Sequence, residues 1–148
     1  MIRIKTLGHA VLRVRDLERS VHFYRDILGL QEVARSGRMA FFSAGEKHHD
    51  LAVMAIGSQA VNPPPDSVGL YHLAFKIGDS LEDLRAAKQW LEGNGVALLG
   101  ESDHTVSQSL YMGDPDGNEI ELYVDTDPEI WRNDPKAITS MKPLVWAS

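Results

Sequence analysis

Two histidines and a glutamate lie at corresponding places along the chain and are the side chains best suited to hold a metal ion. His9 precedes the apolar stretch AVLRV, and His72 opens the similar stretch HLAFKI. Glu121 lies in the stretch NEIELYV, near the end of the chain. Two imidazole nitrogens and a carboxylate oxygen together suit divalent first-row metals. The residue types therefore predict a site for Fe(II), Mn(II) or another divalent metal.

The alternation of apolar and polar residues places all three side chains on one kind of sheet face. Successive side chains of a strand point to opposite faces, so an apolar face identifies the side that packs on a helix. His9, His72 and Glu121 each fall on the opposite face. The apolar sets are Ala10, Leu12 and Val14; Leu73, Phe75 and Ile77; and Ile120, Leu122 and Val124. Any one histidine could be an ordinary core or surface residue, but three matching positions favour the lining of a shared cavity.

The elements that must position these side chains occur twice. GHAVLRVRDL and YHLAFKIGDSL align with their histidines in register, and each runs from a strand into a helix. The predicted order is βαβββ in residues 4–57, a proline-rich linker, βαβββ again in residues 70–124, and a tail over 125–148. We expect an α+β fold in a single domain, with the two modules side by side and their curved mixed sheets enclosing the metal cavity.

Periodicity and turn residues predict the individual elements. A strand is expected over residues 4–14, and Asp16 opens a helix that ends at Gly29. The segment SLEDLRAAKQWLEGNG is the second helix, with Leu84 and Leu91 among its inward residues. The linker GSQAVNPPPDSVG cannot be a helix or a central strand, because it contains three consecutive prolines. The other strands are expected at LQEVAR, RMAFFSAG, HHDLAVMAI, LYHLAFKIG, ALLG, VSQSLYMG and NEIELYV.

Composition excludes several classes of protein. With 148 residues, 43% hydrophobic and 24% charged, the chain matches an ordinary soluble globular domain. A net charge of −6 argues against nucleic acid or an anionic membrane as a partner. The absence of cysteine excludes disulfides, thiolate metal ligands and cysteine nucleophiles. No apolar run approaches membrane-spanning length and the first residues carry no apolar signal core, so we expect a cytoplasmic protein.

Three further residues stand where they could act on a ligand at this site. Tyr111 lies ten residues before Glu121, on the strand predicted to pair with it across the DPDGN turn. His104 begins that same strand. His49, in EKHHDLAVM, shares the alternation of Leu51 and is predicted to face the cavity. Each also has an ordinary interpretation, as a solvated histidine beside charged residues or as a tyrosine in a cavity wall.

Nearly the whole chain resembles a known superfamily. From GHAVLRVRDLERSVHFYRDILGL through YHLAFKIGDSLEDL to LYMGDPDGNEIELYVD, it resembles the vicinal oxygen chelate superfamily, which includes glyoxalase I, fosfomycin-resistance proteins, bleomycin-binding proteins and extradiol ring-cleaving dioxygenases. The resemblance implies metal ligands at His9, His72 and Glu121. The string DHTVSQSLYMGDPDGNEIELY is especially similar to the catechol 2,3-dioxygenase branch. That branch implies an oxidoreductase of aromatic catabolism that uses Fe(II) and O2 to open a catechol-type aromatic diol.

The resemblance to extradiol dioxygenases also implies roles for the other three residues. His49 would be the base that takes the catechol proton and a partner for bound oxygen. His104 and Tyr111 would hydrogen-bond a catechol oxygen, with Tyr111 as an acid or base during ring expansion. The sequence departs from the family pattern in three respects: the residue after His104, the interval of seven from His104 to Tyr111, which is slightly shorter than expected, and the single copy of a unit that the two-domain enzymes repeat. Thr105 follows His104, where the family often has glycine, and this departure bears on the role of His104.

Other activities of the superfamily provide the alternatives. A glyoxalase-like lyase or isomerase would need a fourth ligand, Glu or Gln, at a cavity-facing position of HHDLAVM, and none occurs there. A fosfomycin-type transferase would need a basic anion pocket, and the sequence contains no such cluster. A metal-free ligand-binding protein of the bleomycin-resistance type would normally lack the His, His, Glu set. The single copy of the unit and the aromatic tail predict a homodimer, with Trp131, Leu144 and Trp146 available for docking.

Overall fold

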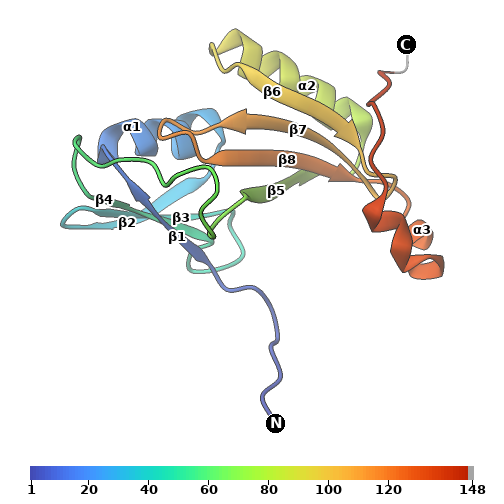
Figure 1. Ribbon diagram of the computed structural model, residues 1–148, viewed down its shortest axis with the longest axis horizontal. Coiled ribbons are helices and arrows are strands. Elements are labelled where there is room, and N and C mark those ends of the chain that lie inside the picture. The colour runs from blue at the N-terminus through green and yellow to red at the C-terminus, as the bar shows by residue number, and fades with distance from the viewer. Residues whose placement is uncertain (147–148) are drawn as a thin grey trace. The chain divides into compact units, whose positions relative to one another are not determined.

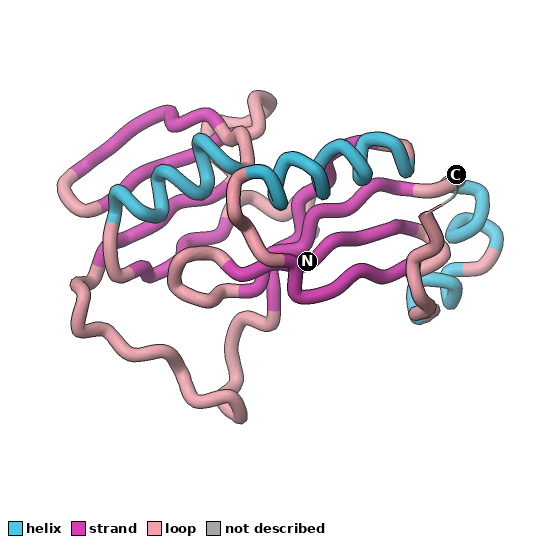
Figure 2. The backbone as a smooth tube through the Cα atoms, turned by 90° about the horizontal axis from the view of Figure 1, so that it is seen from above, coloured by secondary structure: helices cyan, strands magenta, loops and turns pink. Residues whose placement is uncertain are grey.

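The computed structural model describes residues 1–146, which form two compact units, the first over Met1–Ser67 and the second from Val68 onward. Each unit has the order βαβββ, so the predicted duplication and the α+β class are confirmed. Residues 56–71, which include the proline-rich linker, contain no helix or strand, and Figure 2 shows this connection as a long loop. That the two modules pack as one domain stays a prediction.

The first unit is a four-stranded sheet with one helical segment. Its strand order is β1-β4-β3-β2, with β1 parallel to β4 and the other neighbours antiparallel. The core lies between the sheet and the helical segment, where Val14, Val21, Tyr24 and Phe42 are all at most 1% exposed. Its elements are β1 (Ala10–Val14), α1 (Leu17–Val21), the π-helical turn η1 (His22–Ile27), β2 (Gln31–Ser36), β3 (Met39–Ser43) and β4 (Leu51–Ala55).

The second unit repeats this topology and continues into a C-terminal extension. Its strand order is β5-β8-β7-β6, again with the first pair parallel. Helix α2 runs along the sheet (Figure 1), and its Leu84 and Leu91 are buried, as are Leu110 and Ile120 on the sheet. The elements are β5 (His72–Gly78), α2 (Leu81–Gly93), β6 (Leu98–Asp103), β7 (Ser107–Gly113), β8 (Glu119–Asp125), α3 (Pro128–Asn133) and the 3-10 turn η2 (Pro135–Thr139).

The predicted helix starts are correct, and each is stabilised by a cap. The Asp16 carboxylate accepts from the Arg19 backbone N–H at 2.8 Å. Ser80 and Asp83 form a reciprocal capping box at the start of α2. Gly78 ends β5 directly beside this cap, and a Cβ atom at that position would collide with the Asp83 side chain. Glycine is therefore required there by close packing.

Two details of the predicted strands are wrong. The first strand begins at Ala10, where pairing with Leu51 begins, and residues 1–8 are exposed instead of continuing the sheet. In β5 the register with β8 shifts between Lys76 and Gly78, so Ile77 is turned outward and is 37% exposed. Neither α3 nor η2 was predicted from the sequence. In the described chain, no helix has the length and apolar character that a bilayer crossing requires.

Candidate metal and catalytic site

The open face of the second sheet brings His72 and Glu121 together. In the register of β5 and β8, His72 pairs with Glu119 and Ala74 pairs with Glu121, so these side chains share one face, opposite α2. The His72 Nε2 atom lies 3.0 Å from the Glu121 Oε2 atom. Glu121 is only 8% exposed, even though it lies on the face of β8 opposite the apolar residues that pack in the core. This pair is the part of the predicted metal site that lies within one unit.

A second carboxylate, which was not predicted from the sequence to belong to the site, contacts the other nitrogen of His72. Glu119 Oε2 lies 3.0 Å from His72 Nδ1. A carboxylate on one ring nitrogen fixes the tautomer and the ring orientation of a metal-binding histidine and leaves the other nitrogen free as the ligand. Glu119 has the same alternation along its strand as Glu121, and that was the signal that could have identified it.

The donor set fits a divalent metal ion. The His72 ring faces a carboxylate at each nitrogen, so Nε2 must carry either a proton or a cation to approach Glu121 favourably. An imidazole nitrogen and a carboxylate oxygen are both ordinary ligands of divalent first-row metals, and His72 Nε2 and Glu121 Oε2 lie only 3.0 Å apart. The second unit can therefore supply two adjacent ligands, one nitrogen and one oxygen.

The other oxygen of Glu121 is held by two hydroxyl groups on the neighbouring strand. Ser109 Oγ donates to Glu121 Oε1 at 2.5 Å, and the Tyr111 hydroxyl donates to the same oxygen at 3.2 Å. Both reach it because β7 pairs with β8 in a register that sets Tyr111 opposite Glu121. Burial, together with the Glu121 carboxylate, raises the pKa of Tyr111. The phenol is therefore protonated at neutral pH and available as a donor.

His104 reaches the same tyrosine from the end of β6. Its Nε2 atom lies 2.6 Å from the Tyr111 hydroxyl and 2.9 Å from Ser102 Oγ. Ser102 Oγ also donates to the Tyr111 hydroxyl at 3.2 Å. The single proton of that hydroxyl thus lies between two groups that can accept it, His104 Nε2 and the Glu121 carboxylate. His104, predicted to begin the strand of Tyr111, instead directly follows β6, and Ser102 lies within hydrogen-bonding distance of both.

The position after His104 has the backbone conformation that favours glycine. Thr105 has a φ of +72° and, among the described residues, is the one non-glycine residue with a positive φ. Hydrogen bonds from the backbone and from the side chain of Thr105 stabilise this conformation. Its N–H donates to the Asp103 carboxylate at 2.7 Å, and its hydroxyl donates to Ser140 Oγ at 2.9 Å. The departure from the family pattern therefore leaves the turn, and the position of His104, intact.

These groups line a pocket of about 610 Å³ in the second unit. Such a volume is within the usual range for small-molecule sites. The polar part of the lining is the hydrogen-bonded group just described, and the remainder is largely apolar. No Lys or Arg of the described chain is among the lining residues, which are Tyr71, His72, Leu99, Gly100, Glu101, Ser102, His104, Val106, Ser107, Tyr111, Glu119, Glu121, Ile138 and Met141.

The first unit gathers His9, His48 and His49. The rings of His9 and His49 have centroids 4.2 Å apart, and His48 Nδ1 lies 2.6 Å from His49 Nδ1. Burial and the two neighbouring histidines lower the pKa of His49, which favours the neutral imidazole that a general base requires. Phe41 packs edge-on against the His49 ring at 5.5 Å between centroids.

The alternation along β4 does not direct His49 to the cavity, contrary to the prediction. Leu51 pairs with Ala10 on the face that packs against the helix, and Ala52 pairs with Val11 on the other face. Sharing the alternation of Leu51 would therefore turn His49 into the core. In the structure β4 begins only at Leu51, and His49 reaches His9 from the preceding loop.

Each unit thus contributes part of the predicted set. His72, Glu121, Tyr111 and His104 lie together in the second unit, and His9 lies with His49 in the first. Over residues 1–146, neither unit contains a group of three or more His, Cys, Asp or Glu side chains arranged to hold a metal ion. The convergence of His9 on the His72 and Glu121 pair stays a prediction.

The chain belongs to the Glyoxalase/Bleomycin resistance protein/Dioxygenase superfamily, whose family model matches residues 6–122. The predicted superfamily is therefore confirmed. The match covers both modules and both halves of the candidate ligand set.

Relatives with different reactions match this chain. It is 39% identical over 128 residues to a catechol-2,3-dioxygenase of Bacillus subtilis (strain 168), covering 86% of this chain and 44% of that protein. It is 34% identical over 122 residues to the glutathione transferase FosA of Serratia marcescens, covering 82% of each. The crystal structure of a glyoxalase/dioxygenase from Nostoc punctiforme superposes with a TM-score of 0.65 at 26% identity, covering 82% of this chain and 91% of that one. The chain spans less than two thirds of the length of the dioxygenases that it matches.

Proposed function

We propose that this protein is an extradiol ring-cleaving dioxygenase that opens a catechol-type aromatic diol with O2. One observation carries the proposal: the Tyr111 hydroxyl lies 2.6 Å from His104 Nε2 and 3.2 Å from Glu121 Oε1. A protonated phenol beside a carboxylate ligand and an imidazole is suited to hold and protonate an oxygen of the substrate. The similarity to a catechol-2,3-dioxygenase supports the same reaction.

Fe(II) is the metal proposed for the site, with Mn(II) or another divalent ion as an alternative. His72 and Glu121 would hold it from the second unit, and His9 would complete the set of two imidazoles and one carboxylate. When bound there, the ion supplies open coordination positions for the two catechol oxygens and for dioxygen, and a path for electrons between them. Glu119 would keep the His72 ring in the orientation that this requires.

The other residues would bind the ring and move protons. The pocket accepts the aromatic ring beside the His72 and Glu121 pair. His49, neutral because of its surroundings, would take a catechol proton as the diol binds. Tyr111 would turn its hydroxyl proton from His104 Nε2 to a ring oxygen when the diol binds, and His104 Nε2 would accept that proton again when the site is empty. His104 and Ser102, which both contact the hydroxyl, fix the phenol in one orientation before the substrate arrives.

The second candidate function is that of a fosfomycin-type transferase, which transfers a thiol to the antibiotic. It is favoured by the relative FosA, which this chain matches over 82% of the length of each protein. The pocket argues against it, since none of its described lining residues is a Lys or Arg that would bind an anionic substrate. A glyoxalase-like reaction is disfavoured because β4, LAVMA, offers no carboxylate or amide as a fourth ligand.

A homodimer is expected in solution. The second unit supplies only two ligands, so the site needs a third from the first unit of the same chain or of a second copy. Trp146 already docks on its own unit, donating to Glu101 at 2.7 Å, and does not support the dimer, whereas Trp131 is 48% exposed. Sedimentation at tens of micromolar should give twice the 16.4 kDa of one chain. Observation of the 16.4 kDa species alone would reject the dimer.

The reaction class is tested by offering one metal-loaded preparation three sets of substrates. The protein is purified without oxygen, loaded with Fe(II) or Mn(II), and given a catechol with O2, fosfomycin with glutathione, or methylglyoxal with glutathione. We expect turnover with the catechol and O2 only. Turnover of either glutathione mixture without ring opening would replace the proposal by the corresponding transferase or isomerase. A cytoplasmic location, and the absence of nucleic-acid and membrane partners, stay predictions from the sequence.

A further inference from the structure

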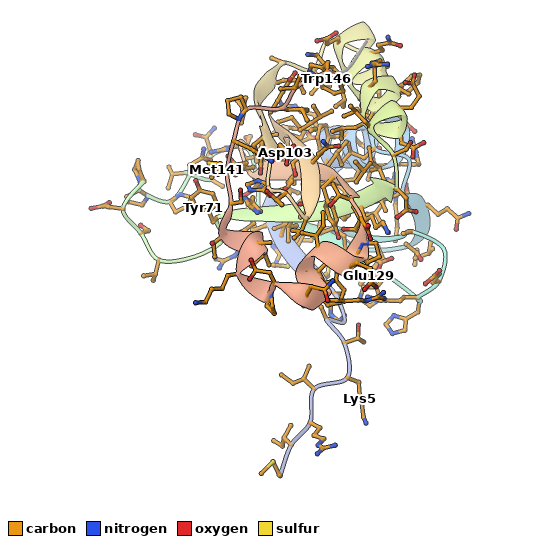
Figure 3. All side chains as sticks on the ribbon, turned by 90° about the vertical axis from the view of Figure 1, so that its right-hand side faces the viewer. Lys5, Tyr71, Asp103, Glu129, Met141 and Trp146 are labelled. Atoms are coloured by element: carbon orange, nitrogen blue, oxygen red, sulfur yellow. The ribbon has the colours of Figure 1, made fainter. Side chains whose placement is uncertain are left out.

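The last described residues, 134–146, form a C-terminal segment that is fastened along the free edge of β6. Asp103 and Lys142 exchange both backbone hydrogen bonds, at 2.8 and 2.9 Å. Further along, the Trp146 indole donates to Glu101 at 2.7 Å, and its ring lies 5.2 Å from the Lys88 ammonium. Figure 3 shows Trp146 beside α2, and Met141 on the side of the unit where Asp103 and Tyr71 lie. The segment is therefore fixed at two separate places.

This attachment places three residues of the segment at the catalytic pocket. Ile138 and Met141 are among its lining residues. The Ser140 carbonyl accepts a hydrogen bond from His104 Nδ1 at 3.0 Å. Because a carbonyl can only accept, His104 must carry a proton on Nδ1, and in that tautomer Nε2 is the acceptor that faces Tyr111. The same segment thus shapes the pocket and sets the tautomer of a catalytic residue.

The part of the pocket lining next to the C-terminal segment is suited to an apolar substituent on the aromatic ring of a bound diol. Leu99 and Val106 of the β6 and β7 region join Ile138 and Met141 in the lining. Of the carboxylates that line the pocket within the described chain, Glu101 is paired with Lys88, and Glu119 and Glu121 flank His72, so the lining offers no Lys or Arg to bind a carboxylate on a ligand. A volume of about 610 Å³ leaves room for a group attached to the ring.

We infer that the C-terminal segment is the specificity element of the pocket, selecting aromatic diols that carry an uncharged, apolar ring substituent over those that carry a carboxylate. This inference rests on the proposed function for the diol itself, and on the lining residues for the substituent. Ile138 and Met141 are 65% and 78% exposed, so they form the rim of the pocket and not part of the core. Substitutions there should change ligand choice without unfolding the protein.

The test is equilibrium binding of two ligands of similar size, 4-ethylcatechol and 3,4-dihydroxyphenylacetate, to the Fe(II)-loaded full-length protein without oxygen. We expect 4-ethylcatechol to bind about tenfold more tightly or better, as is typical for an apolar group in an apolar subsite. Met141→Lys, and separately Ile138→Lys, should lower that preference by about tenfold, because each adds a cation that favours the carboxylate. Val145→Lys is the matched control, at a position that is 74% exposed and not part of the lining, and should leave the preference unchanged.

The outcomes separate this inference from the proposed function. Equal affinity for the two ligands, no binding of either, or the same loss of preference in the Val145 variant would overturn the role of the segment even if catechols are opened. Conversely, a preference for 4-ethylcatechol that both rim variants reduce would support the segment even if oxygen yields no ring-opened product. In that case only the dioxygenase assignment would fail.

Discussion

Replacing Tyr111 by phenylalanine is expected to keep the metal bound and to lower the turnover of a catechol by about 10²–10⁴-fold, the usual contribution of a general acid or base. The change removes one hydroxyl and leaves the ring. That hydroxyl lies 2.6 Å from His104 Nε2 and 3.2 Å from the Glu121 carboxylate. Its loss therefore removes the group that links the His104 imidazole to the Glu121 carboxylate. Ser109 still donates to Glu121 in the variant and should keep the carboxylate in place.

The measurement compares turnover and metal content of the wild type, the Tyr111 variant and a matched control. Tyr123→Phe is that control, because Tyr123 lies on the same face of the neighbouring strand but is not part of the pocket lining. It should retain turnover within a few-fold of the wild type. If Tyr111→Phe opens a catechol as fast as the Tyr123 variant does, Tyr111 is only a packing residue, and the assignment of His104 as its partner fails with it.

Replacing His72 or Glu121 by alanine is expected to abolish stoichiometric metal binding, and His9→Ala should do the same. Each change removes one ligand of three. Loss of Glu121 also leaves Ser109 and Tyr111 without their shared acceptor, so the effect on this part of the site exceeds the loss of a single contact. A smaller effect is expected for Glu119→Gln, which keeps the size of the side chain but removes the charge that orients His72. Such changes typically cost 10–100-fold in metal affinity.

Metal content after anaerobic loading and gel filtration checks these variants, with His22→Ala as the control. His22 is an exposed histidine of η1 whose ring contacts Asp26 at 3.0 Å, and its loss should leave the metal content unchanged. Stoichiometric metal in all three ligand variants would contradict the site. Loss in the His72 and Glu121 variants with full retention in the His9 variant would confine the metal to the second unit and remove His9 from the account.

The fold follows from the sequence wherever one face of an element is clearly apolar. The alternation around Ile120, Leu122 and Val124 correctly predicts β8 and the face that carries Glu121, because burying the apolar side fixes the register. The capping residues Asp16 and Ser80 likewise mark the true helix starts. The first strand was extended too far, because residues before Ala10 look apolar enough for a strand but have no strand beside them.

The site was only partly predictable, because much of it depends on pairing between strands and not on the sequence within each strand. Ser102 and Ser109 acquire their roles from the register, which sets Ser102 opposite Ser109 and within reach of Tyr111, and brings Ser109 within reach of Glu121. Ser140 is more distant still: its carbonyl meets His104 only because the C-terminal segment returns to the edge of β6. Every residue has a backbone carbonyl whatever its side chain, so no sequence pattern could have identified this contact.

The most direct test of the dioxygenase assignment follows oxygen and ring-opened product in the same reaction. Protein freshly loaded with Fe(II) is mixed with 4-ethylcatechol, and O2 uptake at an oxygen electrode is compared with the absorbance of the yellow semialdehyde. Because both oxygen atoms enter the product, we expect one O2 consumed for each ring opened, at a rate that Tyr111→Phe lowers by about 10²–10⁴-fold. Metal-loaded protein that binds the catechol but forms no ring-opened product in the presence of O2 would contradict the account, and would limit the similarity to the fold and the metal site.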